Sequence, residues 1–589
     1  MSITNLLYSS KLGLFANQSA LNAVSHNIAN VNTPGYSRQT VSLEANPGAA
    51  AIPGRSGEGV LVADLKRQVD ALVDKRLRLG MEESGRLESR DRFLGLMEDV
   101  FNDLDGEGFS SRMESFFQSV DAAADNPINP VARAQVVASA EDLSLFATKM
   151  QTSLEELALP VDQEVTNMLD QINSTLGNLE EINGQIVAAL AAGGQPLDLQ
   201  DQRQQLVQNL SRMLDVQVLD GGNGGISVLS GSGQLLLDQS FRAVFSRSEG
   251  TTTAAGFQGI AINGEAFDYT DLVHGGSLKG LLEIRDQTIH GENGYLTRLE
   301  SLVDEIRFQT NLAHVTAVPQ NMLQELTGVM NLGNDLTTVM GSLVTDPTSS
   351  DYLDSPTDLG RTEIQAGTIT FARGSDSDNL TTVTVTVDPA TQSLTDLVTA
   401  IGTATGMSAE ITANNRLRVY TTDGTEVFGV VSDTSNVLAA LGVGALFGGN
   451  GARDMTVNQD LLADTNRLGI SRVDVSSGTP VFDDASNAGI LALGALRSTK
   501  FTIGGNMLTF SSHYADIAGD LGVARAQNEE SMAAQESSAA FLQDVRDSIS
   551  GVSLEEELTD LVKFQRAFQA SSRMVSVADE LLETIIGMI

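Results

Sequence analysis

The side chains that could perform acid-base catalysis or bind a metal are few and scattered in this sequence. Histidine is the commonest protein ligand for transition metals and the usual proton-transfer group near neutral pH, yet the five histidines lie far apart and outside metal-binding spacings. No HExxH, GxSxG or calcium-loop pattern occurs. We therefore predict a protein that is not an enzyme and that has no catalytic residues. We expect each histidine to be a solvated or hydrogen-bonded surface residue: His26, His274, His290, His314 and His513.

Other candidate chemistry in the sequence is equally weak. The paired acids Asp376/Asp378 and Asp483/Asp484 stand in polar, Gly- or Ser-rich surroundings, where turns are the better interpretation and weak calcium binding stays open as an alternative. The glycine cluster at 221–225 lacks the Gly-Lys-Ser/Thr ending of a phosphate loop, so it predicts hairpin turns. The absence of cysteine excludes disulfides and zinc thiolates. We predict no cofactor and no metal site.

The charge balance excludes several classes of partner. The 589 residues carry a formal net charge of −40, which argues against nucleic acid and against a polybasic membrane anchor. No apolar run reaches the roughly 18 residues of a membrane span. The first residues, MSITNLLYSS, lack the basic segment and apolar core of a cleavable signal peptide. We expect a soluble protein without membrane insertion.

The strongest pattern is a seven-residue apolar repeat at both ends of the chain. A heptad repeat keeps a narrow apolar seam on one side of a helix, which is the arrangement that pairs helices lengthwise. The first 43 residues also contain no acidic residue, although the whole chain has 76. Ordinary core-facing helices are the alternative interpretation. The predicted assembly interface comprises Leu7, Leu14, Leu21 and Ile28 at the N-terminus, and Leu554, Leu561, Phe568, Val575 and Leu582 at the C-terminus.

Local signals mark where the two terminal helices end and begin. The first pattern runs from about residue 3 to Asn30, a residue type that tolerates a left-handed helix cap. Pro34 and Gly35 suit the central positions of a type II turn. Ser553 with Glu556 three residues later predicts a capping box for the last helix.

The remaining patterns predict a multidomain α+β fold. A discontinuous α-helical terminal domain would combine residues 1–65 and 551–589, including two adjoining strands. A mainly helical domain would combine 66–320 and 485–550, with a small β-hairpin region near 215–270. An inserted β-rich outer domain would occupy 321–484, where Val383, Val385 and Val387 alternate with threonines as in a half-buried strand. The Thr-, Asp- and Gly-rich stretch that runs through 347–356 is typical of a domain boundary.

Two terminal motifs resemble those of a known family. The stretch from Ser25 to Tyr36 (SHNIANVNTPGY) and the run from Leu561 to Ala570 (LVKFQRAFQA) are similar to the end signatures of bacterial flagellar axial proteins, the rod, hook and hook-associated subunits. Three internal stretches make the chain most similar to the hook-associated subunits of the hook-filament junction: 115–133, 199–207 and 275–286. The residues of the first motif that would shape the exit from the first helix are Asn30, Asn32, Pro34, Gly35 and Tyr36.

The resemblance implies a function and a set of partners. It implies a structural subunit that is exported through the flagellar type III apparatus and that joins hook to filament in the extracellular flagellum. Its partners would be further copies of itself in a ring, the hook protein, the second junction protein, and a cytoplasmic export chaperone on the C-terminal helix. A hook or distal-rod subunit, or an exported adhesin-like surface-binding protein, stays open as an alternative.

Overall fold

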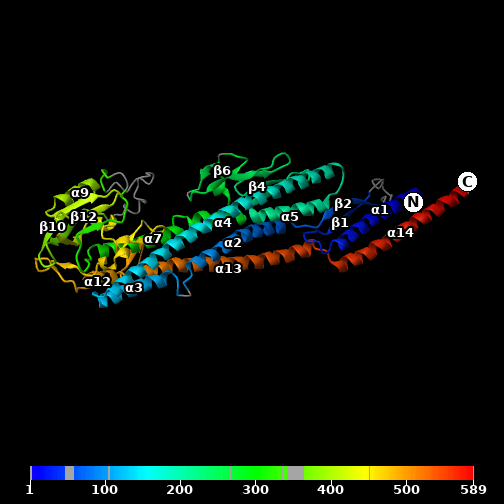
Figure 1. The fold of residues 1–589 in the computed structure, drawn as a ribbon. Coiled ribbons are helices and arrows are strands. Elements are labelled where there is room, and N and C mark those ends of the chain that lie inside the picture. The colour runs from blue at the N-terminus through cyan, green and yellow to red at the C-terminus, as the bar shows by residue number, and fades with distance from the viewer. Residues whose placement is uncertain are drawn as a thin grey trace. The chain divides into compact units, whose positions relative to one another are not determined.

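A computed structural model describes residues 3–46, 59–103, 106–253, 255–265, 267–332, 336–340, 364–449 and 451–587 (Figure 1). The chain forms two compact units. The first comprises Met1–Phe93, Val161–Ile284 and Ala526–Ile589, and the second comprises Leu94–Pro160 and Arg285–Arg525. The predicted multidomain α+β fold is confirmed. The three-domain boundaries stay a prediction, and the composition change around 347–356 lies outside the described residues.

Long helices dominate the first unit. An apolar stripe runs along residues 165–190, where Val165, Ile172 and Leu179 are fully buried on one face of a helix. Residues three and four apart share a helix face, so this spacing presents a continuous apolar surface to neighbouring elements. The helices that contribute to this unit are α1 (Ile3–Ala29), α2 (Ala71–Phe101), α4 (Pro130–Ala191), α5 (Leu197–Met213), α6 (Gly276–Leu282), α13 (Phe510–Ser550) and α14 (Leu554–Gly587); the division between the units falls within α2, α4 and α13.

Short antiparallel strands accompany these helices in the first unit. Strands β1 (Gln39–Ala45) and β2 (Val60–Arg67) pair next to α1. The glycine cluster 221–225 forms the turn between β3 and β4, so the predicted hairpin is confirmed. The strands of this region are β3 (Val216–Asp220), β4 (Ile226–Ser230), β5 (Leu235–Leu237), β6 (Phe245–Thr252) and β7 (Gln258–Ile262).

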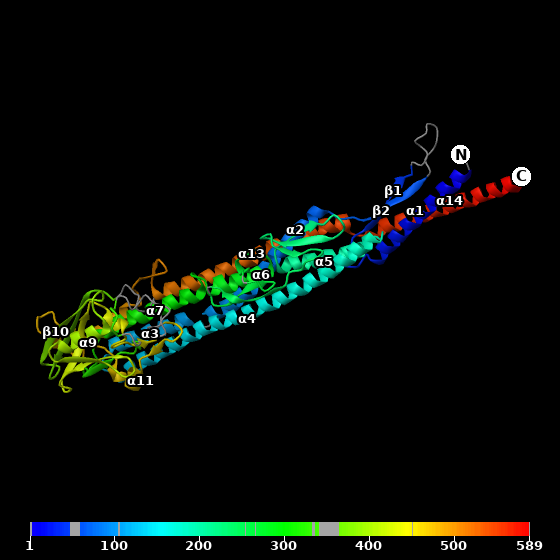
Figure 2. The ribbon, with the colours of Figure 1, turned by 90° about the horizontal axis from the view of Figure 1, so that it is seen from above.

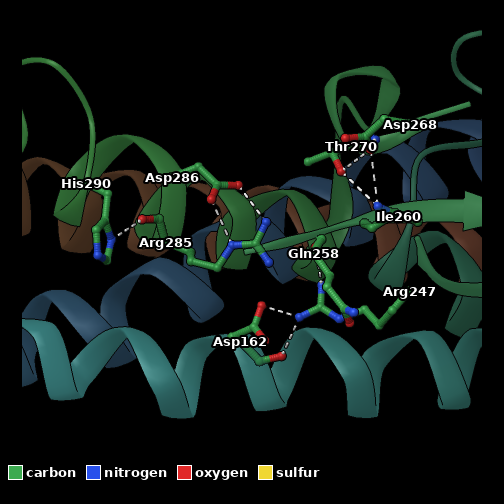
Figure 3. Close-up of polar contacts among 9 residues, drawn as sticks. All are labelled: Asp162, Arg247, Gln258, Ile260, Asp268, Thr270, Arg285, Asp286 and His290. Atoms are coloured by element: carbon green, nitrogen blue, oxygen red, sulfur yellow. Dashed lines mark hydrogen bonds and ion pairs between the residues drawn. The ribbon is translucent and has the colours of Figure 1, made fainter. Parts of the chain in front are cut away.

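Polar contacts hold the β6–β7 hairpin against α4. The Arg247 guanidinium pairs with the Asp162 carboxylate on α4 and also donates to the backbone oxygen of Gln258 over 3.1 Å (Figure 3). Asp268 Oδ1 accepts hydrogen bonds from the backbone N–H groups of Ile260, in the middle of β7, and of Thr270. The hairpin is therefore anchored by charge-assisted bonds as well as by its apolar residues.

The helical part of the second unit is built around a π-helical turn and helix α7. In the π-helical turn Glu283–Ile289, the fully buried Arg285 donates from Nε and Nη2 to the two carboxylate oxygens of Asp286, each over 2.8 Å (Figure 3). His290 Nδ1 lies 3.0 Å from the Arg285 carbonyl oxygen. The further helices here are α3 (Phe109–Asp125), α7 (Tyr295–Val315), α9 (Leu394–Thr403), α10 (Val437–Ala440), α11 (Gln459–Ala463) and α12 (Ala488–Ala495).

An apolar core in the second unit includes Phe371 on β9 and Phe428 on β13. In β10, Val385 and Val387 are buried while Thr382, Thr384 and Thr386 are exposed, as the alternating pattern predicts. The main sheet has the order β10-β9-β13. The strands of this unit are β8 (Glu325–Thr327), β9 (Gly367–Gly374), β10 (Leu380–Val387), β11 (Met407–Ile411), β12 (Leu417–Thr421), β13 (Val427–Asp433), β14 (Phe447–Gly448), β15 (Thr456–Val457), β16 (Val473–Asp474), β17 (Val481–Phe482), β18 (Phe501–Ile503) and β19 (Asn506–Leu508).

Two of the histidines are not surface residues, contrary to the sequence-based expectation. His314 is 6% exposed: its Nδ1 lies 2.7 Å from the Gly444 carbonyl oxygen, and its Nε2 accepts from the Gly469 N–H over 3.0 Å. His513 is also buried, with Nε2 3.0 Å from the Phe501 carbonyl oxygen. Both were misjudged because a buried imidazole is stable wherever the fold supplies its hydrogen-bond partners.

Candidate functional site: the junction of the two chain ends

Helices α1 and α14 lie side by side and antiparallel, with the N- and C-terminal ends of the chain at the same end of the pair (Figures 1 and 2). Two side-chain contacts fix the direction. Asn17 Nδ2 lies 3.5 Å from Ser571 Oγ, and Asn27 Nδ2 donates to Glu557 Oε2 over 3.1 Å. Because a later residue of α1 pairs with an earlier residue of α14, the two helices run in opposite directions.

Small residues line the closest approach of the two helices. A Cβ atom added at Gly13 would stand 3.3 Å from Ser571 Oγ, which is tighter than ordinary van der Waals contact. Ala16 and Ala20 on α1 and Ala578 on α14 are also buried. Short side chains let two helix backbones approach closely, so the innermost contact is made by these residues and the larger heptad residues lie beside it.

The predicted assembly residues lie along this helix pair at intermediate exposure, except for one. Leu554 at the start of α14 is exposed at 46%. Side chains that are only half-covered keep part of their apolar surface available for further packing. The half-buried members are Leu7, Leu14, Leu21 and Ile28 on α1, and Leu561, Phe568, Val575 and Leu582 on α14.

A second set of large apolar side chains on the same helices is exposed. Phe15 on α1, for example, is 51% exposed. Such side chains are individually common on protein surfaces, but here they gather on one helix pair, which is typical of an interaction surface. We call this set the exposed apolar residues of the helix pair: Tyr8 and Phe15 on α1, and Leu554, Leu558, Val562, Met574, Val577, Leu581, Ile585 and Ile586 on α14.

The chain leaves α1 through the predicted turn at Pro34 and Gly35. The Tyr36 N–H donates to the Thr33 carbonyl oxygen over 3.2 Å, and Gly35 has φ +77°, as the third position of a type II turn requires. An added Cβ at Gly35 would also overlap the side chain of Gln205, which donates to the Pro34 carbonyl oxygen. The positive φ and the close approach of the Gln205 side chain therefore both favour glycine at position 35.

Asn30 and Asn32, two further residues of the motif, have different surroundings. Asn30 is not in the left-handed region, so the expected left-handed cap is wrong. Its side chain instead donates to the His26 carbonyl oxygen over 3.0 Å and accepts from Thr33 Oγ1 over 3.2 Å. Asn30 thus ends the helix through side-chain hydrogen bonds, which asparagine forms readily with nearby backbone, while Asn32 is exposed to solvent.

Asn27 is the centre of a buried polar network at the end of α1. Its Oδ1 accepts from Tyr36 Oη over 2.8 Å and from the Gln39 N–H over 2.9 Å. Its Nδ2 donates to the Gln39 carbonyl oxygen over 2.9 Å as well as to Glu557. All the strong hydrogen-bonding positions of this amide are used, so it joins the helix end, the turn, the first strand and the C-terminal helix.

Glu557 is a buried carboxylate that is paired from both chain ends. It is 1% exposed, and its Oε1 accepts from Arg38 Nε over 2.7 Å. Arg38 also reaches Glu556, with Nη1 2.8 Å from Oε2. Glu556 therefore pairs with an arginine of the other chain end, and the capping box of Ser553 and Glu556 stays a prediction. Burial of a carboxylate is costly unless it is paired and hydrogen-bonded, which this arrangement provides.

Helices α5 and α13 hold the turn from the other side. Asp201 accepts from the Ser37 N–H over 3.1 Å and from Arg67 Nη1 over 2.6 Å. Asp198 accepts from Gln39 Nε2 over 2.8 Å. On α13, Arg546 Nη2 donates to the Gly35 carbonyl oxygen over 3.2 Å. Side chains from these two helices thus help to fix the path of the chain from α1 into β1.

The same surroundings keep the Tyr36 phenol protonated. Burial raises the pKa of Tyr36 above its usual value, and the negative charges of Asp198, Asp201 and Glu557 raise that pKa further. The phenol therefore stays a hydrogen-bond donor to Asn27 across the physiological range. Its role in the network is structural, since a protonated donor orients its acceptor.

Sequence reasoning missed the residues that do most of the joining. Asn27, Arg38 and Gln39 belong to or directly follow the motif that carried the family resemblance, but their partners are distant in sequence. The sequence did hold one signal for the pair of Arg38 and Glu557. Glu557 lies in the helix that carries the C-terminal motif, and Arg38 directly follows the N-terminal motif.

The described residues offer little other chemistry. They contain no group of three or more His, Cys, Asp or Glu side chains arranged to hold a metal ion. Within the same parts of the chain, no helix is long and apolar enough to cross a membrane. What the junction can do is hold two helices together and present their apolar side chains.

Family models of flagellar proteins match the chain in three places. The family model described as the flagellar hook-associated protein FlgK helical domain matches residues 94–321. Two further models match the ends: the flagella basal body rod protein at residues 7–36, and the C-terminal region of the flagellar basal body rod FlgEFG proteins at residues 546–588. The two end matches cover most of α1 and α14.

Whole-length relatives carry the same description. Flagellar hook-associated protein 1 of Escherichia coli is 26% identical over 100% of both chains, and that of Bacillus subtilis is 24% identical over 99% of this chain and 97% of its own. A solved structure, the flagellar hook junction protein FlgK from Burkholderia pseudomallei, is 16% identical with a TM-score of 0.52. It covers 81% of this chain and 100% of its own, which shows a shared fold.

Proposed function

Since the chain belongs to the FlgK-type flagellar hook-associated proteins, which are structural parts of the flagellum, we propose that it joins the hook to the filament. In this proposal the subunit is exported through the flagellar type III apparatus and assembles outside the cell as a ring. Its neighbours are further copies of itself, the hook protein and the second junction protein. The paired helices α1 and α14 make the contacts that hold the ring together.

The observation that carries the proposal is the apolar surface left uncovered on this helix pair. The half-buried heptad residues and the exposed apolar residues of the helix pair lie on the same two helices. Burying one leucine or phenylalanine completely contributes about 1.5–3 kcal/mol before the cost of ordering. Several such side chains per subunit supply a strong driving force for packing against neighbouring subunits.

Locating the protein in intact flagella tests the proposal. An epitope inserted at Gly424, in an exposed turn with open space around it, would leave the terminal helices untouched. In a cell whose own copy is replaced by this version, we expect immunogold label in a single band between hook and filament. Label spread along the hook or confined to the rod would contradict the proposal.

The C-terminal helix supports a second part of the proposal, which concerns the protein before export. An exposed apolar helix face in the cytoplasm needs a partner to stay soluble, and we propose a small helical chaperone that receives α14 in a groove. Pull-down of the full chain and of a version without residues 551–589 tests this. Undiminished chaperone binding by the truncated chain would refute it.

A hook or distal-rod subunit is the rival function, because the family models that match both ends are those of basal body rod proteins. The two functions differ in what the purified protein does alone. A hook or rod subunit polymerises into long tubes, whereas a junction protein stops at a ring or stays monomeric. Electron microscopy of the concentrated protein separates the two.

A further inference from the structure

Helix α4 carries a row of exposed apolar side chains that is separate from those of the terminal helix pair. Val131 is 73% exposed, Leu145 61% and Leu159 62%. These residues occupy one heptad position, and the heptad positions between them are exposed as well. The row is open to solvent over about 40 Å of helix, at 1.5 Å per residue. We call it the α4 stripe: Val131, Ala138, Leu145, Thr152 and Leu159.

The opposite face of this helix segment is packed into the second unit. Val136, Leu143 and Leu154 are each at most 1% exposed, and the segment up to Pro160 belongs to that unit. The described residues therefore hold the helix in place and leave the α4 stripe uncovered. A single apolar residue at every seventh position forms a narrow seam, which fits a second helix better than a broad surface.

Two rows of side chains flank the α4 stripe, and they carry its charges. The row four positions after the stripe residues is Gln135, Asp142, Lys149 and Glu156. The row three positions after them is Ala134, Glu141, Thr148 and Glu155. Since the whole chain has a formal net charge of −40, another copy can pack here only if these acids do not meet one another.

The charges fit a second copy whose α4 runs antiparallel, with the two-fold axis at Leu145. Positions equally far before and after Leu145 then lie opposite each other, so Val131 meets Leu159 of the second copy. In such a pair each flanking row meets its own counterpart. Asp142 of each copy therefore lies within one residue of the position opposite Lys149 of the other, which gives two pairs of opposite charge.

The other charged residues of the flanking rows meet neutral side chains in this arrangement. Glu141 lies opposite Thr148 of the second copy, and Glu155 lies opposite Ala134. Glu156 lies opposite Gln135 in the same way. No two like charges of the flanking rows are opposed.

A parallel pair of the same helices would bring acids together. In a parallel pair the two different flanking rows meet, so Asp142 would lie beside Glu141 of the other copy, and Glu156 beside Glu155. Exposed ion pairs add little strength, but like charges in contact disfavour an arrangement. Asp142 also pairs with Arg112 of its own chain over 3.2 Å, and its side chain is still 61% exposed. Its carboxylate is thus open to a second cation.

We propose that two free copies of this chain pair through the α4 stripe, antiparallel and with Leu145 on the two-fold axis. The subunits of a ring all point the same way, so this contact cannot join neighbours in a ring. The pair is a state of the free protein, and it separates before a subunit enters an assembly. This inference goes beyond the proposed function and does not depend on it.

Disulfide formation between single-cysteine variants of the full chain tests the pairing and its direction, because the chain has no cysteine of its own. Oxidised at one protein concentration, Leu145→Cys should link to itself at least about tenfold faster than Val131→Cys. In the proposed pair the two copies of position 131 lie about 40 Å apart. Val131→Cys is therefore the matched control, on the same stripe and similarly exposed. A mixture of Val131→Cys and Leu159→Cys should link faster than either variant alone.

A charge exchange tests the contact between Asp142 and Lys149. In the Leu145→Cys chain, Asp142→Lys puts two ammonium groups together at both ends of the contact, and linkage should slow by about tenfold. Adding Lys149→Asp exchanges the charges and should restore the rate. The pair with Arg112 is lost in both variants, so restoration reports the contact between copies.

Each outcome decides for or against the antiparallel pair. Linkage of Leu145→Cys that is no faster than that of Val131→Cys overturns it. So does self-linkage of Leu145→Cys, Val131→Cys and Leu159→Cys at equal rates, which a parallel pair would give. An unchanged rate with Asp142→Lys, or a charge-exchanged variant that stays slow, also overturns it. Fast self-linkage at position 145 alone, linkage in the mixture and restoration by the exchange together support it.

Discussion

Asn27 near the end of helix α1 donates a hydrogen bond to Glu557 near the start of helix α14, over 3.1 Å and across 530 positions of sequence. Both side chains are 1% exposed. Buried polar side chains need hydrogen-bond partners, and this contact forms only when both ends of the chain are folded against each other. It ties the signature motif of the N-terminus to that of the C-terminus.

Replacing Asn27 should therefore loosen the helix pair. Asn27→Ala removes one donor from the buried Glu557 and the acceptor of Tyr36, and we expect a loss of about 1–3 kcal/mol in the stability of the first unit. Denaturant unfolding and hydrogen exchange of residues 554–560 would measure it. The control Asn32→Ala, at an exposed position of the same turn, should stay within about 0.5 kcal/mol of the wild type. Equal effects of the two changes would refute the account of this network.

The turn after α1 predicts opposite results for two glycine substitutions. Gly35→Ala places a Cβ at φ +77° and against Gln205, so it should destabilise the first unit by about 1–3 kcal/mol. Gly184→Ala, within helix α4 and with open space around it, should stabilise the unit by about 0.5–1 kcal/mol. Thermal unfolding of both variants checks the signs. A Gly35→Ala protein as stable as the wild type would mean that the turn relaxes without cost.

Much of this arrangement could be predicted from the sequence, because the signals are local. The heptads placed a helix at each end, Pro34 and Gly35 gave the turn, and alternating valines and threonines gave strand β10. The half-burial of Leu14 and Phe568 is also in keeping with their heptad positions. The spacing of apolar residues indicates which face of a helix is apolar, and the helices of the structure have their apolar faces where this spacing predicts them.

The sequence could not reveal which residues meet across the helix pair. The closest contact uses Gly13, Ala16 and Ala20, small residues that carry little weight in an apolar pattern. The pairing of Arg38 with Glu557 joins residues 519 positions apart, and an acidic residue at a helix start has a sufficient local explanation in the helix dipole. Long-range polar pairs of this kind leave no periodic signal.

From the burial of His314 we predict that the second unit becomes less stable in acid. Its burial lowers the pKa of His314, so the unfolded chain takes up a proton first when the pH falls below the ordinary histidine value of about 6.5. The stability that depends on the neutral ring is fully present above that pH and declines below it. Unfolding measured between pH 5 and pH 7.5 should show this decline, and His314→Gln should reduce it.

Hydrogen exchange near Gly444 and Gly469, the two hydrogen-bond partners of His314, tests this prediction locally. Peptides containing Gly444 and Gly469 should exchange faster in the wild type as the pH falls, after correction for intrinsic rates. The same slope in His314→Gln would assign the acid sensitivity to other groups.

The central claim is that the apolar surface of the α1 and α14 pair builds the junction, and charge placed on that surface tests it. Phe15→Asp and Leu558→Asp each put a carboxylate on an exposed apolar position, where folding of the single chain should survive. Gln18→Asp and Thr559→Asp add the same charge at exposed polar positions of the same helices.

The most direct measurement is electron microscopy of cells that carry each variant in place of the native copy, with export checked in the medium. The account predicts hooks without filaments for Phe15→Asp and Leu558→Asp, and normal filaments for Gln18→Asp and Thr559→Asp. Normal filaments on cells carrying both Phe15→Asp and Leu558→Asp, with the protein exported at wild-type level, would contradict it.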